Sequence, residues 1–291
     1  MSKINLILVA RLTIGEALRR RILLAGFGVT AVFLALYGTG AYFAFRDIRS
    51  SAGSSLTSGA LTSGDQVLAI QSALFLAMGL FVASMVGALV AAFTAVGTIS
   101  SEVEQGILQT IVTRPVTRRD VILGKFLGHG LLLSLYLGVF FLALVGIVYS
   151  QGGWRPDNLP LTAAVVVLQS LVILAAAMLG STIFSAATNG VVVLLLYGTA
   201  LIGGFLEQAG AVLSNETLFQ IGIASGLLMP TDSLYRYAVQ LLQGDLSALG
   251  TVAMGPMGSA SPPSVWVLVY ALFFMAAALC AATAAFSRRD L

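Results

Sequence analysis

Uncharged stretches long enough to cross a lipid bilayer as helices recur along this 291-residue chain. Apolar residues make up 58% of the sequence and charged residues only 9%. Because soluble globular proteins carry roughly a quarter of charged residues, the composition excludes a water-soluble fold. We therefore expect a single all-α domain of a polytopic membrane protein with six transmembrane helices. The predicted spans are residues 22–45, 67–99, 122–149, 161–184, 190–213 and 264–286.

The fifth predicted span is the least regular of the six. Its apolar run, 190–206, is shorter than the roughly 20 residues that a crossing needs, so we extend it to residue 213. Gly203, Gly204 and Glu207 are expected to break this helix near the outer membrane face.

The basic residues indicate how the spans are oriented. Eleven Lys and Arg residues fall on the side that also holds both termini, and four fall on the other. The positive-inside rule therefore places both termini in the cytoplasm. The expected location is a prokaryotic plasma or inner membrane. Residues 3–21 combine Ile4, Ile7, Leu8 and Leu12 with basic side chains, which predicts an amphipathic helix at the cytoplasmic interface.

The longest predicted extracytoplasmic loop is 214–263. Its apolar part, Leu218 to Met229, is too short for a crossing, which favours a re-entrant or interfacial segment. A second helix is expected from Thr231, with Tyr235, Arg236 and Tyr237 at the outer membrane surface.

The predicted cytoplasmic loop, 100–121, is the densest polar stretch of the chain. Ser101 and Glu104 match a capping box, which predicts a short helix. Arg114 before Pro115 ends that helix, and Thr117 with Asp120 gives a second capping signal for the next span. The bland alternative is a solvated tether whose positive charge only satisfies the inside rule.

The run EVEQGILQTIVTRPVTRRDVILGKFLGHG resembles the signature of ABC-2 type permeases, the membrane subunits of ATP-binding-cassette exporters. Ile107 departs from the pattern, since the family usually has threonine there. The matching residues are Glu102, Glu104, Gly106, Arg114, Pro115, Val116, Arg118, Gly124 and Lys125.

The resemblance implies that loop 100–121 holds a coupling helix, which docks on a cytosolic ATPase subunit that binds ATP and Mg. The chain itself is then a non-enzymatic permease without cofactor, metal or nucleic acid, and it works as a homodimer or as a heterodimer with a related permease. Gly124-Lys125 lacks the remaining residues of a phosphate-binding loop. The residues implied in ATPase coupling are Glu102, Glu104, Gly106, Arg114, Pro115, Arg118 and Lys125.

Two further stretches, GKFLGHG and MPTDSLYRY, look like those of the permease in the nitrous-oxide-reductase maturation transporter. This branch would serve a periplasmic protein rather than expel drugs.

Other functions fit the sequence less well. A secondary transporter or channel usually carries ionisable residues within its spans, whose central portions hold none here. An intramembrane enzyme lacks support, because HExxH and GxSxG motifs are missing. A non-transporting assembly factor for a periplasmic protein stays open. Cys280, the single cysteine, excludes an ordinary zinc site.

Small and polar residues in the spans have two interpretations each. His129, the single histidine, is either a cargo or pH-sensing site or, as we favour, a polar residue paired with a neighbouring helix. Gly124 with Gly128, and Ala176 with Gly180, are expected to let helices pack closely within the bundle or, less commonly, at a dimer interface.

Overall fold

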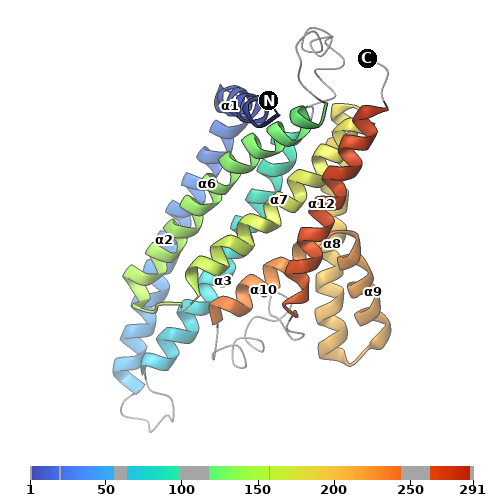
Figure 1. Cartoon of the computed structure of the whole chain (residues 1–291). Coiled ribbons are helices and arrows are strands. Elements are labelled where there is room, and N and C mark those ends of the chain that lie inside the picture. The colour runs from blue at the N-terminus through green and yellow to red at the C-terminus, as the bar shows by residue number, and fades with distance from the viewer. Residues whose placement is uncertain are drawn as a thin grey trace.

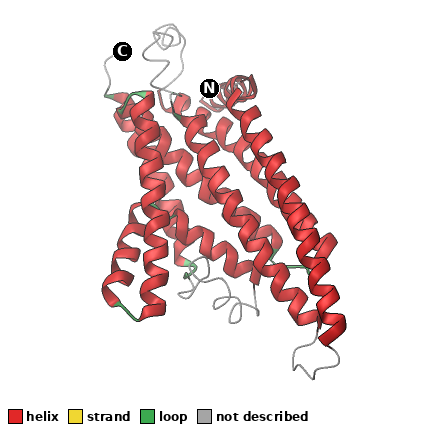
Figure 2. Ribbon diagram, turned by 180° about the vertical axis from the view of Figure 1, so that it is seen from behind, coloured by secondary structure: helices red, strands yellow, loops and turns green. Residues whose placement is uncertain are grey.

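The computed structural model describes residues 2–19, 21–55, 64–96, 98, 118–156, 158–243 and 263–288. The described residues form helices and a few turns, with no strand among them (Figure 2). The helices are α1 (Ser2–Arg19), α2 (Arg21–Ser55), α3 (Gly64–Ala95), α6 (Arg118–Gly152), α7 (Leu159–Ile183), α8 (Ala186–Leu213), α9 (Glu216–Leu228), α10 (Thr231–Gln243) and α12 (Trp266–Ser287).

Six of these helices, α2, α3, α6, α7, α8 and α12, are long and apolar enough to cross a membrane. Each overlaps one of the six predicted spans, so the predicted fold class is confirmed. The second predicted span, 67–99, begins at the same residue as the candidate membrane span Val67–Ala95 and extends beyond the last residue of α3, which covers Gly64–Ala95. The remaining helices, α1, α9 and α10, are too short or too polar to be counted as crossings.

The bundle has two distinct ends (Figure 1). The terminal end holds α1, the last residues of α3, the first residues of α6 and the C-terminal end of α12. The hairpin end, opposite to it, holds the turn between α8 and α9. Helix α1 lies across the terminal end rather than along the bundle, and exposes Ile7, Leu8 and Leu12.

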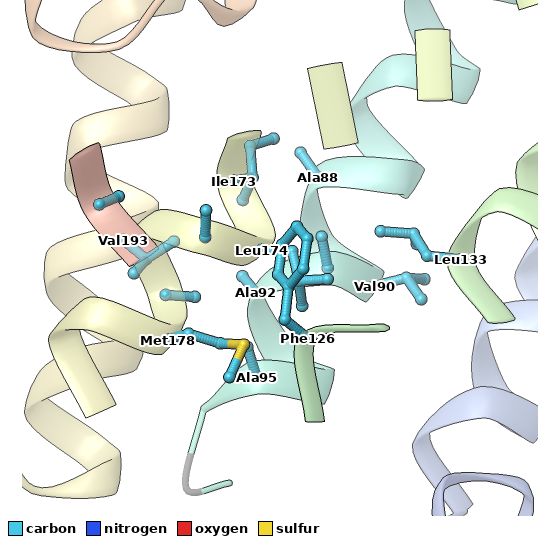
Figure 3. Close-up of a cluster of buried hydrophobic side chains, with 14 of the residues drawn as sticks. Ala88, Val90, Ala92, Ala95, Phe126, Leu133, Ile173, Leu174, Met178 and Val193 are labelled. Atoms are coloured by element: carbon cyan, nitrogen blue, oxygen red, sulfur yellow. The ribbon is translucent and has the colours of Figure 1, made fainter. Parts of the chain in front are cut away.

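Helices α3 and α7 form the centre of the bundle. Of the most apolar window of α7, 61% is buried within the chain, against 11% for α2. Alanine residues of α3, such as Ala88 and Ala92, let Phe126 of α6 reach Leu174 and Met178 of α7 (Figure 3). Helices α2 and α12 therefore leave most of their surface to lipid or to other chains.

Helix α10 is inserted among the spans instead of lying on the outer surface. It packs against α7, α3, α8 and α12, and Tyr235, Arg236 and Tyr237 are all buried. The three side chains are therefore covered by neighbouring helices instead of being exposed to the headgroup layer, and their depth in the membrane stays a prediction. Tyr235 is covered by α3, because its ring meets Phe81 at 5.5 Å between centroids and its hydroxyl donates to the carbonyl of Ala77 at 3.3 Å.

Helix α8 runs unbroken to Leu213, so the predicted break at Gly203, Gly204 and Glu207 is wrong. The glycines serve close packing instead. A Cβ at Gly203 would overlap Ser225 of α9, and one at Gly210 would overlap the backbone of Phe219. Gly222 of α9 faces the backbone of Glu207 in the same way. Helices α8 and α9 thus form a tight hairpin, which turns at Ser214 in a left-handed conformation.

Candidate functional site: two buried polar sites in the bundle

The loop implied in ATPase coupling leaves and re-enters the bundle at the terminal end. Helix α3 ends at Ala95 and helix α6 begins at Arg118, directly after the predicted cap Thr117. Five of the seven implied coupling residues lie outside the described residues, as does the side chain of Arg118. Those five are Glu102, Glu104, Gly106, Arg114 and Pro115.

Lys125 is the implied coupling residue whose side chain is described. It lies about two helical turns after the start of α6 and is only 6% exposed. Its ammonium Nζ donates to the carbonyl of Thr98 at 2.6 Å, and the Thr98 hydroxyl donates to the carbonyl of Thr94 at 2.9 Å. Thr98 lies three residues beyond the last residue of α3, so the ammonium is close to the negative end of this helix's dipole, where a buried cation is favoured. Lys125 therefore ties the end of α3 to α6.

The next turn of α6 is packed against α1. His129 is buried, and its Nδ1–H donates to the carbonyl of Lys125 at 3.0 Å. At Gly128, a Cβ would come within 2.8 Å of both the carbonyl oxygen of Ala10 and the Cβ of Thr13 in α1. The close approach predicted for Gly128 is therefore found, and its partner is the N-terminal helix. Through Gly128 and Lys125, α6 contacts both α1 and the end of α3.

A second buried polar site lies where α10 meets the spans. Arg236 is 3% exposed, and its Nε donates to Oδ2 of Asp232 at 2.6 Å. The two residues are four positions apart on α10, a spacing that brings side chains together on one helix face. Burial raises the pKa of the Asp232 carboxyl, and the Arg236 guanidinium opposes that rise. A close ion pair compensates two charges that would otherwise be costly inside the bundle.

Two residues of α8, Gly204 and Glu207, belong to the surroundings of this ion pair. Gly204 lies directly against it, because a Cβ there would overlap the Asp232 carboxylate. Glu207, one turn further on, is half-buried. Thus the chain does carry ionisable groups within the bundle, and the sequence-based view that the spans are free of them missed the contribution of α10. The four-residue spacing of Asp232 and Arg236 in the sequence indicates an ion pair on one helix face, but it does not show that the pair is buried.

A third polar contact crosses between α7 and α8. Asn189 is fully buried, and its Nδ2 donates to the carbonyl of Ala177 at 2.8 Å. A Cβ at Gly180 would overlap the Asn189 side chain. Gly180, predicted to allow close packing, therefore does so within the bundle by making room for an amide.

Comparisons with known proteins bear on the whole chain. Residues 7–291 match the family described as ABC-2 family transporter protein. No match was found among curated proteins, and the likeness to the nitrous-oxide-reductase maturation permease stays a prediction. The family match runs from α1 to the C-terminal end and includes both buried polar sites. With six helices suited to crossing a bilayer, the chain is a multi-pass membrane protein that belongs to the ABC-2 transporter family.

Proposed function

We propose that this chain is the permease subunit of an ATP-binding-cassette exporter, and that a separate cytosolic ATPase drives it. The family match over residues 7–291 carries the proposal. It is supported by the placement of Ala95 and Arg118, which open and close the implied coupling loop at the same end of the bundle as both termini. The membrane is the prokaryotic plasma or inner membrane, and two permease copies, identical or related, complete the pathway.

The contact between Lys125 and Thr98 suggests how a force on the loop reaches the spans. The loop that starts after Thr98 and ends at Arg118 is held at its base by one buried ammonium group. A displacement of the loop by the ATPase would therefore move the end of α3 and the start of α6 together. Helix α1 would follow, because it is packed on Gly128 of the same helix.

The proposal is tested with the full chain and the ATPase that co-purifies with it. Replacing Glu102 and Glu104 by alanine should weaken ATPase binding at least tenfold, which corresponds to about 1.4 kcal/mol. The matched control is Glu216→Ala, an exposed acidic residue at the hairpin end. Unchanged ATPase binding and ATP hydrolysis in the double variant would remove the coupling role of the two glutamates.

A second experiment tests which side of the membrane the loop faces. The exposed Cys280 is first replaced by serine, and Thr113→Cys is then introduced into the loop. A membrane-impermeant maleimide should label this cysteine in inverted vesicles and not in intact cells. Labelling from outside intact cells would contradict an ATPase-coupled loop.

An ion-coupled transporter is the second candidate, favoured by the buried pair of Asp232 and Arg236. Intramembrane charges often mark ion pathways. In this chain the two charges are paired with each other at 2.6 Å, which suits a structural role as well. Cargo movement that persists without ATP and collapses with the ion gradient would favour this candidate over the exporter.

A further inference from the structure

A cavity lies where α3, α7, α8 and α10 meet. It offers about 10 Å³ to the centre of a water molecule, which is the room that one water molecule requires. Its walls mix apolar and polar side chains, so it differs from the dry voids of an apolar core. The lining residues are Phe81, Ser84, Gln169, Tyr197, Leu201, Thr231, Asp232 and Tyr235.

The hydroxyl of Thr231 is the group in this cavity that indicates a bound ligand. It is fully buried, and among the residues that the structure describes its hydroxyl has no hydrogen-bond partner. Its backbone N–H donates to the carbonyl of Met229, so the main chain is satisfied while the side chain is not. Buried hydroxyls are nearly always paired with protein or ordered water, because an unpaired one costs free energy.

The part of the cavity wall that α3 and α7 supply is polar as well. The Ser84 hydroxyl of α3 donates to Oε1 of Gln169 in α7 at 3.0 Å, and both residues are buried. An amide oxygen and a hydroxyl oxygen can each accept a second hydrogen bond. Together with Thr231 and the Asp232 carboxylate, they surround the space with the two to four polar groups that an ordered water uses.

The charges around the cavity favour a neutral ligand over a cation. The Asp232 carboxylate is already paired with the Arg236 guanidinium. It also lies in the first turn of α10, where the helix dipole supplies further positive potential. Glu207 is half-buried and does not line the cavity. A neutral molecule that both donates and accepts hydrogen bonds is therefore the best match.

We propose that this cavity is a binding site for one ordered water molecule, which bonds the Thr231 hydroxyl and links α10 to the polar pair of α3 and α7. The proposal is independent of the exporter function. The water would hydrate the contact region between α10 and the helices α3, α7 and α8. Direct contacts there are supplemented by a ligand that can exchange when the helices separate.

A second cavity of the same size serves as an internal comparison. It offers about 10 Å³ between α1, α3 and α6 and is lined by Ala17, Val90, Thr94, His129, Leu132 and Leu133. Here the Thr94 hydroxyl already donates to the carbonyl of Val90 at 2.8 Å, and His129 Nδ1 bonds the carbonyl of Lys125. With these groups engaged, the second cavity is expected to stay dry.

The first test uses the sign of a stability change. Thr231→Val replaces the hydroxyl by a methyl group of similar size. If the cavity is dry, the variant removes an unpaired polar group and its unfolding temperature in detergent rises. If water is bound, the variant loses that hydrogen bond and the temperature falls. Thr162→Val is the matched control, since Thr162 is also fully buried and donates to the carbonyl of Asn158 at 2.9 Å, so its temperature should fall in either case.

The second test detects the water directly by radiolytic hydroxyl labelling of the full chain in detergent. Tyr235 lines the cavity, whereas Tyr136 does not, and both are only 4% exposed. Oxidation of Tyr235 should exceed that of Tyr136 several-fold and should drop to the same level in Thr231→Val. Equal, low oxidation of both tyrosines together with a stabilised Thr231→Val would overturn the proposal. So would an unfolding temperature that rises in sodium chloride relative to choline chloride and loses that response in Thr231→Val, because the ligand would then be a cation.

Discussion

The bundle holds two buried charged sites that are built on different principles. At the terminal end, the ammonium of Lys125 is bound to the backbone carbonyl of Thr98, just beyond the end of α3. Around α10, the guanidinium of Arg236 is bound to a carboxylate on its own helix. The first contact joins two residues that are 27 positions apart, whereas the second pairs two charges on the same helix. The comparison shows that a buried charge can either fix the relative position of helices or allow a polar helix to enter an apolar bundle.

This difference also explains what each site contributes to the fold. Removing Lys125 would release the end of α3 from α6 while leaving the body of each helix intact. Removing one member of the α10 pair would leave the other charge buried without its partner. The largest expected effects therefore belong to α10, and the following variants test this ranking.

Arg236→Met should have the largest effect. Losing one partner of a buried ion pair typically costs about 3–5 kcal/mol, because the remaining charge stays uncompensated. The double variant Asp232→Leu/Arg236→Met should recover most of this loss in a thermal unfolding assay in detergent. As a control, Arg155→Met alters an exposed arginine that stacks on Tyr149 at 4.7 Å and should change little. A double variant as unstable as Arg236→Met would show that the loss does not come from an uncompensated Asp232 charge.

Lys125→Met should rank second. The expected loss is about 1.5–3 kcal/mol, the usual value of a hydrogen bond to a charged group. The matched control is Arg119→Met, an exposed basic residue in the first turn of the same helix. Unfolding in detergent and ATP hydrolysis of the complex should both be measured. If ATP hydrolysis no longer depended on the permease while stability stayed unchanged, the contact between Lys125 and Thr98 would serve the transmission of movement rather than folding.

Gly204→Ala should rank next, since its Cβ would overlap the Asp232 carboxylate. Overpacking of this kind typically costs about 1–3 kcal/mol. Gly198→Ala in the same helix meets nothing within 4 Å and should be neutral or stabilising by up to about 1 kcal/mol. Gly128→Ala, with Gly138→Ala as its open counterpart, poses the same question at the terminal end. Equal unfolding temperatures for Gly204→Ala and Gly198→Ala would mean that α10 moves away from α8 without cost.

Ser84→Ala should have the smallest effect of the set. It removes the hydrogen bond from Ser84 to Gln169, worth about 0.5–1.5 kcal/mol. Ser134→Ala is the control, because Ser134 donates to the carbonyl of Gly130 within its own helix at 2.7 Å. If Ser84→Ala lost more stability than Lys125→Met, the hydrogen bond between α3 and α7 would stabilise the bundle more than the contact of Lys125 does.

The sequence predicts the long spans well, because a crossing helix has a length and a lack of charge that can be counted directly. The capping signal of Thr117 and Asp120 also predicts a helix that leads into the third span, and α6 is helical from Arg118, the first described residue there. The position of α10 could not be predicted in this way. Tyr235, Arg236 and Tyr237 have the composition of a membrane-surface segment, and only the surrounding helices reveal that they are covered. The partner of Lys125 is likewise invisible in the sequence, because a backbone carbonyl carries no residue-specific signal.

The glycine contacts between α8 and α9 have a consequence for how the chain enters the membrane during synthesis. Helix α9 has 13 residues and is about 20 Å long, too short to span a hydrocarbon core of roughly 30 Å by itself. Its backbone instead lies against Gly203 and Gly210 of a helix that has already left the ribosome. We therefore expect α9 to insert only when α8 is already in place, and α10 to pack against the bundle after that. A chain that ends at Leu228 and has been released from the ribosome should already protect α9 from a protease added on the side of the hairpin end.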